Sequence, residues 1–152
     1  DAVPAFEAAP GGGKILQVKH TYWSPGTGVT ITNQMWITDL DVTITPTSSS
    51  SKLISFINFG MLHQSGSDNY IEVRYYRDST TTIDGGGYGL GHSNYYGTYM
   101  VHNYKPHSYV LPHQETTGST TSREYNIRMN TDSNWQIHRD AVNSHIIMEY
   151  EV

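Results

Sequence analysis

Eight histidines are the residues of this sequence with the widest capacity for chemistry, because a neutral imidazole is a common metal ligand. Zinc sites usually bring their ligands at short, regular spacing, such as two histidines with three residues between them. The closest pair, His102 and His107, has four residues between its members and fits no such pattern. In a trimer, one histidine near the three-fold axis would supply three ligands, and His20 and His145 are the candidates. We otherwise expect no metal and no cofactor.

Two pairs of carboxylates have a spacing that acid–base catalysis can use: Asp39 with Asp41, and Glu149 with Glu151. Residues two apart on a strand share a face, with Cα atoms about 7 Å apart, and retaining glycosidases hold their carboxyl groups ~5 to 5.5 Å apart. The simpler interpretation is that these carboxylates form the solvated faces of strands. The glycine-rich stretch 84–89 lacks the strand-to-helix context of a phosphate loop. We therefore expect a protein that is not an enzyme.

A tyrosine-rich segment indicates binding instead of catalysis. Its candidate ligand-binding residues, which lie among glycines, are Tyr88, His92, Asn94, Tyr95, Tyr96 and Tyr99. Tyrosine supplies rigid, amphipathic contact area at small entropic cost, and asparagine adds adaptable hydrogen bonds. Because aromatic faces also stack on sugar rings, a host-surface glycan is the expected class of ligand. The alternative is that these tyrosines are core and edge residues of a tyrosine-rich β protein.

The elements that must position these residues are organised around residues 38–59. Apolar and polar residues alternate from 40 to 44, which predicts a half-buried strand, and Pro46 should end it. After a polar turn, residues 53–59 are apolar on both faces, as in a strand that is covered on both sides. We expect these two segments to pair as a hairpin with one half-exposed arm and one central arm.

Short strands with frequent turns account for most of the remaining chain. The predicted strands are 14–20, 29–37, 70–77, 93–104, 109–111, 123–130, 135–138 and 145–152. Pro112 should stop one strand and be followed by a polar linker at 113–122, and residues 143–144 should form the last turn. Since no window repeats every 3.6 residues, the pattern predicts an all-β fold, an antiparallel β-sandwich or jelly roll. Residues 1–13 read as an N-terminal arm, and residues 14–152 as a single domain.

Composition excludes several classes of function. The 152 residues carry a formal charge of -5 and no basic run, which argues against a nucleic-acid partner. No apolar stretch approaches the ~18 residues that a membrane-spanning helix needs, so we expect no membrane insertion. Charged residues make up only 15% of the chain and cysteine is absent. Because the chain starts at Asp1, we expect a fragment or a processed product.

An ordered set of segments resembles a domain, of C-terminal type, that is common in tail-fibre and virion structural proteins of marine phages. The segments are 14–18 (KILQV), 40–54 (LDVTITPTSSSSKLI), 77–81, 109–111, 125–128, 137–140 and 145–150. The resemblance implies a virion domain, namely a trimeric β-sandwich knob similar to tumour-necrosis-factor-like heads. It covers nearly the whole chain, with no counterpart for residues 63–69 and 84–94.

Together these patterns predict a structural protein on the surface of a phage virion. The expected partners are further copies of the chain in a homotrimer, other virion proteins and a host-surface glycan. Three weak sites on one rigid knob would act at high effective concentration, so that avidity exceeds single-site affinity by ~10² or more. The alternatives are a lectin-like or depolymerase module that acts on polysaccharide, and a structural decoration without a ligand.

Overall fold

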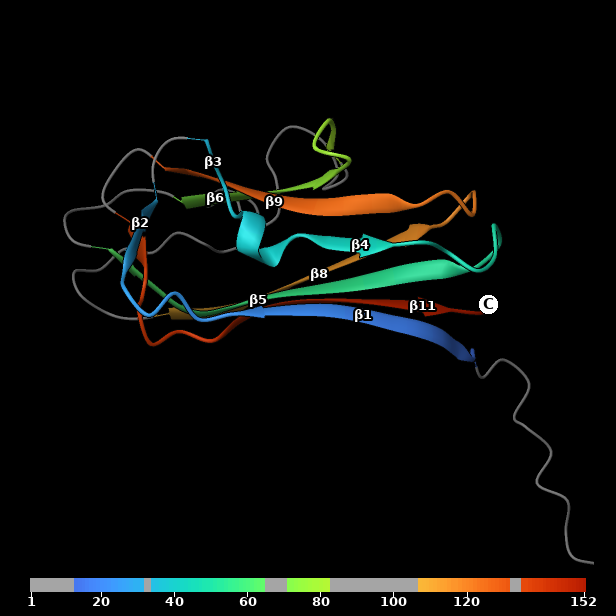
Figure 1. Ribbon diagram of the computed structural model, residues 1–152, viewed down its shortest axis with the longest axis horizontal. Coiled ribbons are helices and arrows are strands. Elements are labelled where there is room, and N and C mark those ends of the chain that lie inside the picture. The colour runs from blue at the N-terminus through green and yellow to red at the C-terminus, as the bar shows by residue number, and fades with distance from the viewer. Residues whose placement is uncertain (1–12, 32–33, 65–70, 83–106, 132–134) are drawn as a thin grey trace, which may run out of the picture.

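The computed structural model describes residues 13–31, 34–64, 71–82, 107–131 and 135–152, and it confirms the predicted all-β sandwich. Two antiparallel sheets pack face to face (Figure 1). Sheet A contains β1 (Ile15–Trp23), β2 (Val29–Ile31), β5 (Lys52–Gln64), β8 (His107–Thr116), β10 (Trp135–Ile137) and β11 (Asn143–Tyr150). Sheet B contains β3 (Met35–Trp36), β4 (Val42–Ile44), β6 (Ile71–Arg77), β7 (Thr81–Thr82) and β9 (Arg123–Thr131).

Strand β5 is the centre of sheet A, as its two apolar faces predict. Along residues 52–58 it pairs with β11, which in turn pairs with β1. Near its other end it pairs with β10, which continues the sheet to β2. Strand β8 also pairs with β5. This strand therefore holds most of sheet A together.

The predicted hairpin of residues 38–59 is wrong, because its two arms lie in different sheets. Strand β4 pairs with β9 in sheet B, with Val42 opposite Tyr125, whereas β5 belongs to sheet A. The chain from 45 to 51 therefore crosses between the sheets. The first arm is also shorter than predicted, since Thr38–Leu40 forms a 3₁₀ turn, η1, in which the amide of Asp41 donates to the carbonyl of Thr38.

Three other local predictions are also corrected. Pro112 does not stop β8, because it sits inside that strand opposite Phe56; a proline is tolerated in a strand where its missing N–H is not needed for pairing. The predicted strand 29–37 is divided between β2 in sheet A and β3 in sheet B. Residues 143–144 begin β11 and do not form a turn.

The core lies between the two sheets and is built from alternate residues of each strand. On β6 and β9 the inward side chains include Tyr75, Tyr125 and Ile127, which are fully buried. The buried hydrophobic residues are Ile31, Ile37, Leu40, Val42, Ile44, Leu53, Ile57, Phe59, Ile71, Val73, Tyr75, Tyr125, Ile127, Met129, Trp135, Ile137, Ala141 and Ile147. In the described part of the chain, no helix is long and apolar enough to cross a membrane.

Candidate functional site

The outer face of sheet A is covered by apolar side chains from four adjacent strands, β1, β11, β5 and β8. Cross-strand register arranges them in rows, which we call together the sheet A outer face. The rows are Ile15–Tyr150–Lys52–Thr116, Val18–Met148–Ile54–Gln114, His20–Ile146–Phe56–Pro112 and Tyr22–Ser144–Asn58–Val110. The most exposed apolar side chains are Tyr22 at 62%, Val110 at 59%, Ile15 at 57% and Val18 at 47%. Ten of the sixteen side chains in these rows are apolar, and an exposed patch of this kind on the outside of a sheet is a typical feature of an interaction surface.

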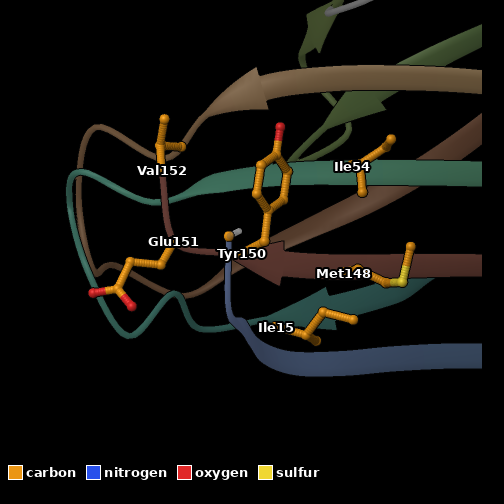
Figure 2. A pocket seen from close by; sticks show the side chains of 7 residues that line it. Ile15, Ile54, Met148, Tyr150, Glu151 and Val152 are labelled. Carbon is orange, nitrogen blue, oxygen red and sulfur yellow. The ribbon is translucent and has the colours of Figure 1, made fainter. Parts of the chain in front are cut away.

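A shallow groove lies at one end of this face and encloses a volume of about 400 Å³. Its lining residues are Gly13, Ile15, Ile54, Met148, Tyr150, Glu151 and Val152. In Figure 2 the aromatic ring of Tyr150 stands between Ile54 and Val152, while the carboxylate of Glu151 points away from these apolar side chains. The groove therefore extends the sheet A outer face to the point where β1 begins and the chain ends.

Charge is nearly absent from the sheet A outer face, where Lys52 is the one formally charged side chain in the four rows. The outer face of sheet B is different, since Arg74, Glu124 and Arg128 alternate there with the inward residues of β6 and β9. The guanidinium of Arg128 lies 4.8 Å from the ring centroid of Tyr76 and 5.4 Å from that of Trp36, distances at which a cation is attracted to an aromatic face. The two sheets thus present surfaces of opposite character.

Strand β11 has a polar residue on its inner side where its sequence pattern suggested a solvated one. Glu149 is fully buried and faces the connection between β4 and β5. Its carboxylate accepts hydrogen bonds from the hydroxyl of Ser51, the amide of Gln17 at 2.6 Å, and the backbone N–H groups of Thr47 at 2.9 Å and Ser48 at 3.2 Å. Burial alone would raise the pKa of Glu149, but these hydrogen bonds lower it to about 2.

The predicted carboxylate pairs are therefore not arranged as acid and base. The side chain of Glu149 is enclosed by donors, whereas Glu151 is exposed beyond the end of β11. Asp39 lies within the η1 turn, and Asp41 follows it without sharing a strand face. Burial, together with the charges of Glu124 and Asp39, raises the pKa of Asp41 to about 6 against the opposing hydrogen bond from Asn126.

His145 lies inside the sandwich and is fully buried. Its Nδ1 is 2.8 Å from the carbonyl oxygen of Leu40, and its Nε2 is 2.8 Å from the hydroxyl of Tyr75. Because a carbonyl can only accept, Nδ1 of the neutral ring carries the proton and Nε2 is the acceptor. The hydroxyl of Tyr75 also lies 2.9 Å from the hydroxyl of Ser55. Burial lowers the pKa of His145 to about 4.

This environment leaves neither ring nitrogen of His145 free to face a three-fold axis. His20, the other axial candidate, is exposed on the sheet A outer face, with its ring centroid 4.9 Å from that of Tyr22. No group of three or more histidine or acidic side chains in the described ranges could hold a metal ion. An axial metal at His20 stays a prediction that depends on the oligomer.

A second hollow, of about 290 Å³, lies beside the turns that follow β6 and β8. Its two arginines are held by neighbours, since Arg77 and Arg123 both pair with Glu115, at 3.2 and 3.4 Å. Arg123 also donates to the carbonyl of Thr117 at 2.7 Å and to the hydroxyl of Ser119 at 2.9 Å. These charges are compensated within the protein, so the hollow is weaker as a site than the sheet A outer face.

The six tyrosine, histidine and asparagine residues predicted to bind a ligand, from Tyr88 to Tyr99, lie outside the described residues. The chain enters that segment from Thr82 and leaves it into His107, which pairs with Leu62 near the end of β5. Gly13 and Val152 lie at the opposite end of sheet A, beside Tyr150. His107 is therefore at a different end of sheet A from Gly13 and Val152.

The sequence analysis did not identify the sheet A outer face, although part of its signal was present. The sequence alternates along 145–152, with Ile146, Met148 and Tyr150 on one face and Ile147 and Glu149 on the other. Nothing in this alternation states which face is buried. Only the packing of β11 against sheet B settles that His145, Ile147 and Glu149 point inward.

Comparison with known proteins gives a likeness in fold. No family model and no curated protein matches the sequence. Among solved structures, a chain of an IBDV viral particle aligns over 100% of this chain and 44% of its own length, with a TM-score of 0.50 and 12% identity. The crystal structure of the infectious bursal disease virus VP2 subviral particle aligns over 100% and 46%, with a TM-score of 0.48 and 11% identity. The chain thus spans less than half of these chains, and the likeness shows the fold alone.

Proposed function

We propose that this protein is a structural domain of a virion, whose work is to assemble and to display a surface and which performs no chemistry. The sheet A outer face is the observation that carries this proposal, because it gives the domain a large uncharged surface for association. The fold that the chain shares with a chain of a viral particle supports the same function. The resemblance of its segments to phage tail-fibre and virion proteins supports it independently.

We further propose that the domain is a homotrimeric knob on a tail fibre or another appendage. Tyr88, Tyr95 and the neighbouring candidate residues would then bind a host-surface glycan. The chain leaves the tyrosine-rich segment at the end of the sandwich that lies away from Gly13. An appendage attached through the N-terminal arm would therefore leave that end free to meet a cell.

Two measurements test the proposed function. Antibodies against the domain should label the surface of intact particles of the virus that encodes it, and sedimentation of the purified chain should give a mass about three times 17.1 kDa. Absence of label from purified particles would contradict a virion role. A stable 17.1 kDa monomer at about 10 µM would contradict the trimer, because a contact that is weaker than micromolar is marginal at that concentration.

The depolymerase alternative requires a separate experiment. Glycan arrays and an assay for released reducing ends should be run with the same polysaccharides. Binding without release is the result expected of an adhesin. Release of sugar would overturn the proposal that the domain performs no chemistry, and blank arrays would favour a structural decoration without a ligand.

A further inference from the structure

We propose that the sheet A outer face is buried against a second copy of this chain, which makes it the contact that holds the oligomer together. This inference rests on the proposed self-assembly and adds which of the available surfaces forms the contact. The groove at Tyr150 would lie at one end of that contact, where Val152 adds apolar area beyond the rows.

The size of the face is the first argument. At a strand spacing of about 4.8 Å and a rise of about 3.3 Å per residue, four strands and seven residues cover roughly 19 by 23 Å, or about 450 Å² in projection. The largest apolar patch on an ordinary monomer measures about 300–600 Å² and is frequently functional. A standard interface buries about 800 Å² on each partner, and the projected area of the sheet A outer face reaches about half of that before the corrugation of its side chains and the groove are added.

The absence of charge is the second argument. It favours another copy over a partner of different sequence that is selected by charge, because Lys52 is the one charged side chain in the four rows. Each further copy brings to the rows only its own Lys52, which lies in the row at one end of the face, so burying the face against further copies desolvates few charges. Depletion of charged residues and enrichment of aromatic residues and methionine, here Tyr22, Met148 and Tyr150, are characteristic of interface cores.

The outer face of sheet B provides the internal comparison. It carries Arg74, Arg128 and Glu124, and Arg128 is already held over the rings of Trp36 and Tyr76. Burying it against another copy would bring like charges together and would require their desolvation. Of the two broad faces of the described sandwich, only that of sheet A can be covered without this penalty.

The test uses charge substitution on both faces of the full chain. Ile54→Glu and Met148→Glu each place a carboxylate in the middle of the sheet A outer face, and Thr43→Glu places one on the exposed outer side of β4 in sheet B. We expect both sheet A variants to weaken self-association by at least about 30-fold, the effect of losing one interface hot spot. The Thr43→Glu control should sediment as the wild type does. Circular dichroism spectra should be unchanged in all three.

A second pair of variants avoids a buried carboxylate, so the proposal can still be tested if the glutamate variants do not fold. The natural sequence has no cysteine, so Val18→Cys and Thr43→Cys each introduce a single reactive thiol. In the oligomer, a bulky maleimide should react with the Thr43→Cys thiol quickly and with the Val18→Cys thiol at least about 10-fold more slowly, because the contact excludes solvent. On dilution to the monomer the two rates should converge.

The results of these experiments test the proposed contact and the proposed self-assembly separately. An oligomer that survives both glutamates and leaves the Val18→Cys thiol fully reactive overturns the inference, while the proposed self-assembly stands with another contact. A wild-type chain that is monomeric at about 10 µM overturns both the trimer and the inference, and points to a different virion protein as the occupant of this face.

Discussion

At the scale of single residues, the protein places polar groups inside and apolar groups outside along the same strand. On β11 the inward residues include His145 and Glu149, while Ile146, Met148 and Tyr150 point outward. A buried carboxylate is stable only where hydrogen bonds replace the water that it loses. The hydroxyl and amide groups around Glu149 supply that replacement, and in doing so they fix the chain that crosses between the two sheets.

Glu149→Gln should reduce the free energy of unfolding by about 2–3 kcal/mol, because hydrogen bonds to a charged acceptor are each worth about 1.5–3 kcal/mol and a glutamine amide would direct its own N–H groups at other donors. Unfolding in urea at pH 7 measures the difference. Glu151→Gln is the matched control, since it changes the same residue type at an exposed position two residues further on. Equal losses in the two variants would contradict a structural role for the buried carboxylate.

His145 should make the protein less stable as the pH falls. Its pKa is about 4 in the folded chain and 6.5 in the unfolded chain, so between these values the unfolded state binds more protons. His145 should therefore lower the unfolding free energy by about 2 kcal/mol from pH 7 to pH 5. Asp41, whose pKa is raised to about 6, acts in the opposite direction over the same range, because the folded state binds its proton more tightly. The contribution of His145 is measured as the difference in unfolding free energy between the wild type and a variant without this imidazole.

Replacing His145 separates its contribution from that of other groups. His145→Gln removes this titration and leaves that of Asp41, so the wild type should lose about 2 kcal/mol relative to the variant between pH 7 and pH 5. His138→Gln, which alters a partly exposed histidine before the last turn, should keep the slope of the wild type. A wild-type slope in the His145→Gln variant would show that another group titrates.

Neither buried residue could be identified from the sequence. The groups that surround Glu149 come from Gln17 and from residues 47–51, about a hundred or more positions away along the chain. Alternation assigns residues to faces, but it does not say which face is buried. For β6 and β9 one face is so much more apolar that the choice was evident, whereas β11 has isoleucines on both.

At the scale of elements, the bounds of the strands with clean alternation of apolar and polar residues could be predicted within a few residues. The strands with which they pair could not be predicted. Strand β6 at Ile71–Arg77 and β9 at Arg123–Thr131 match their predicted ranges closely. The failure at residues 38–59 has a physical reason. Neighbouring strands in sequence most simply form a hairpin, but in a sandwich a connection can also cross to the opposite sheet. The crossing at 45–51 is fixed by the distant Glu149, which local pattern does not contain.

Gly60 is a point where the pairing of two strands depends on a missing side chain. A Cβ at this position would lie 2.9 Å from the backbone nitrogen of Val142 and against its carbonyl oxygen, neither of which can rotate away. Gly60→Ala should therefore cost about 1–3 kcal/mol of unfolding free energy, as overpacking does in other cores. Gly28→Ala is the control, since its Cβ would meet the side chain of Gln136 at 3.5 Å and the carbonyl oxygen of Ile137 at 3.9 Å, both ordinary van der Waals distances. A similar effect of both substitutions in urea unfolding would contradict the close approach of β5 to the residue before β11.

At the scale of the whole molecule, the outer faces of the two sheets differ in charge. Sheet B carries charge and remains compatible with water, while sheet A presents an apolar face that is proposed to meet another copy. The ends are also distinct, since Gly13 and Val152 lie beside Tyr150, whereas His107 pairs with Leu62 near the other end of β5. Composition pointed to an all-β protein with little charge, but only the register of β1, β11, β5 and β8 shows where the uncharged surface lies.

This division predicts how the oligomer responds to salt and temperature. A contact made by the sheet A outer face gains its stability from apolar burial, which salt does not screen and which weakens on cooling. The dissociation constant should therefore be unchanged or lower when NaCl is raised from about 0.05 to about 1 M, a range over which the screening length falls several-fold. It should rise when the solution is cooled. Sedimentation at both salt concentrations and two temperatures measures these changes. A contact through Arg74, Glu124 and Arg128 of sheet B would respond in the opposite way to salt, because screening weakens attraction between opposite charges.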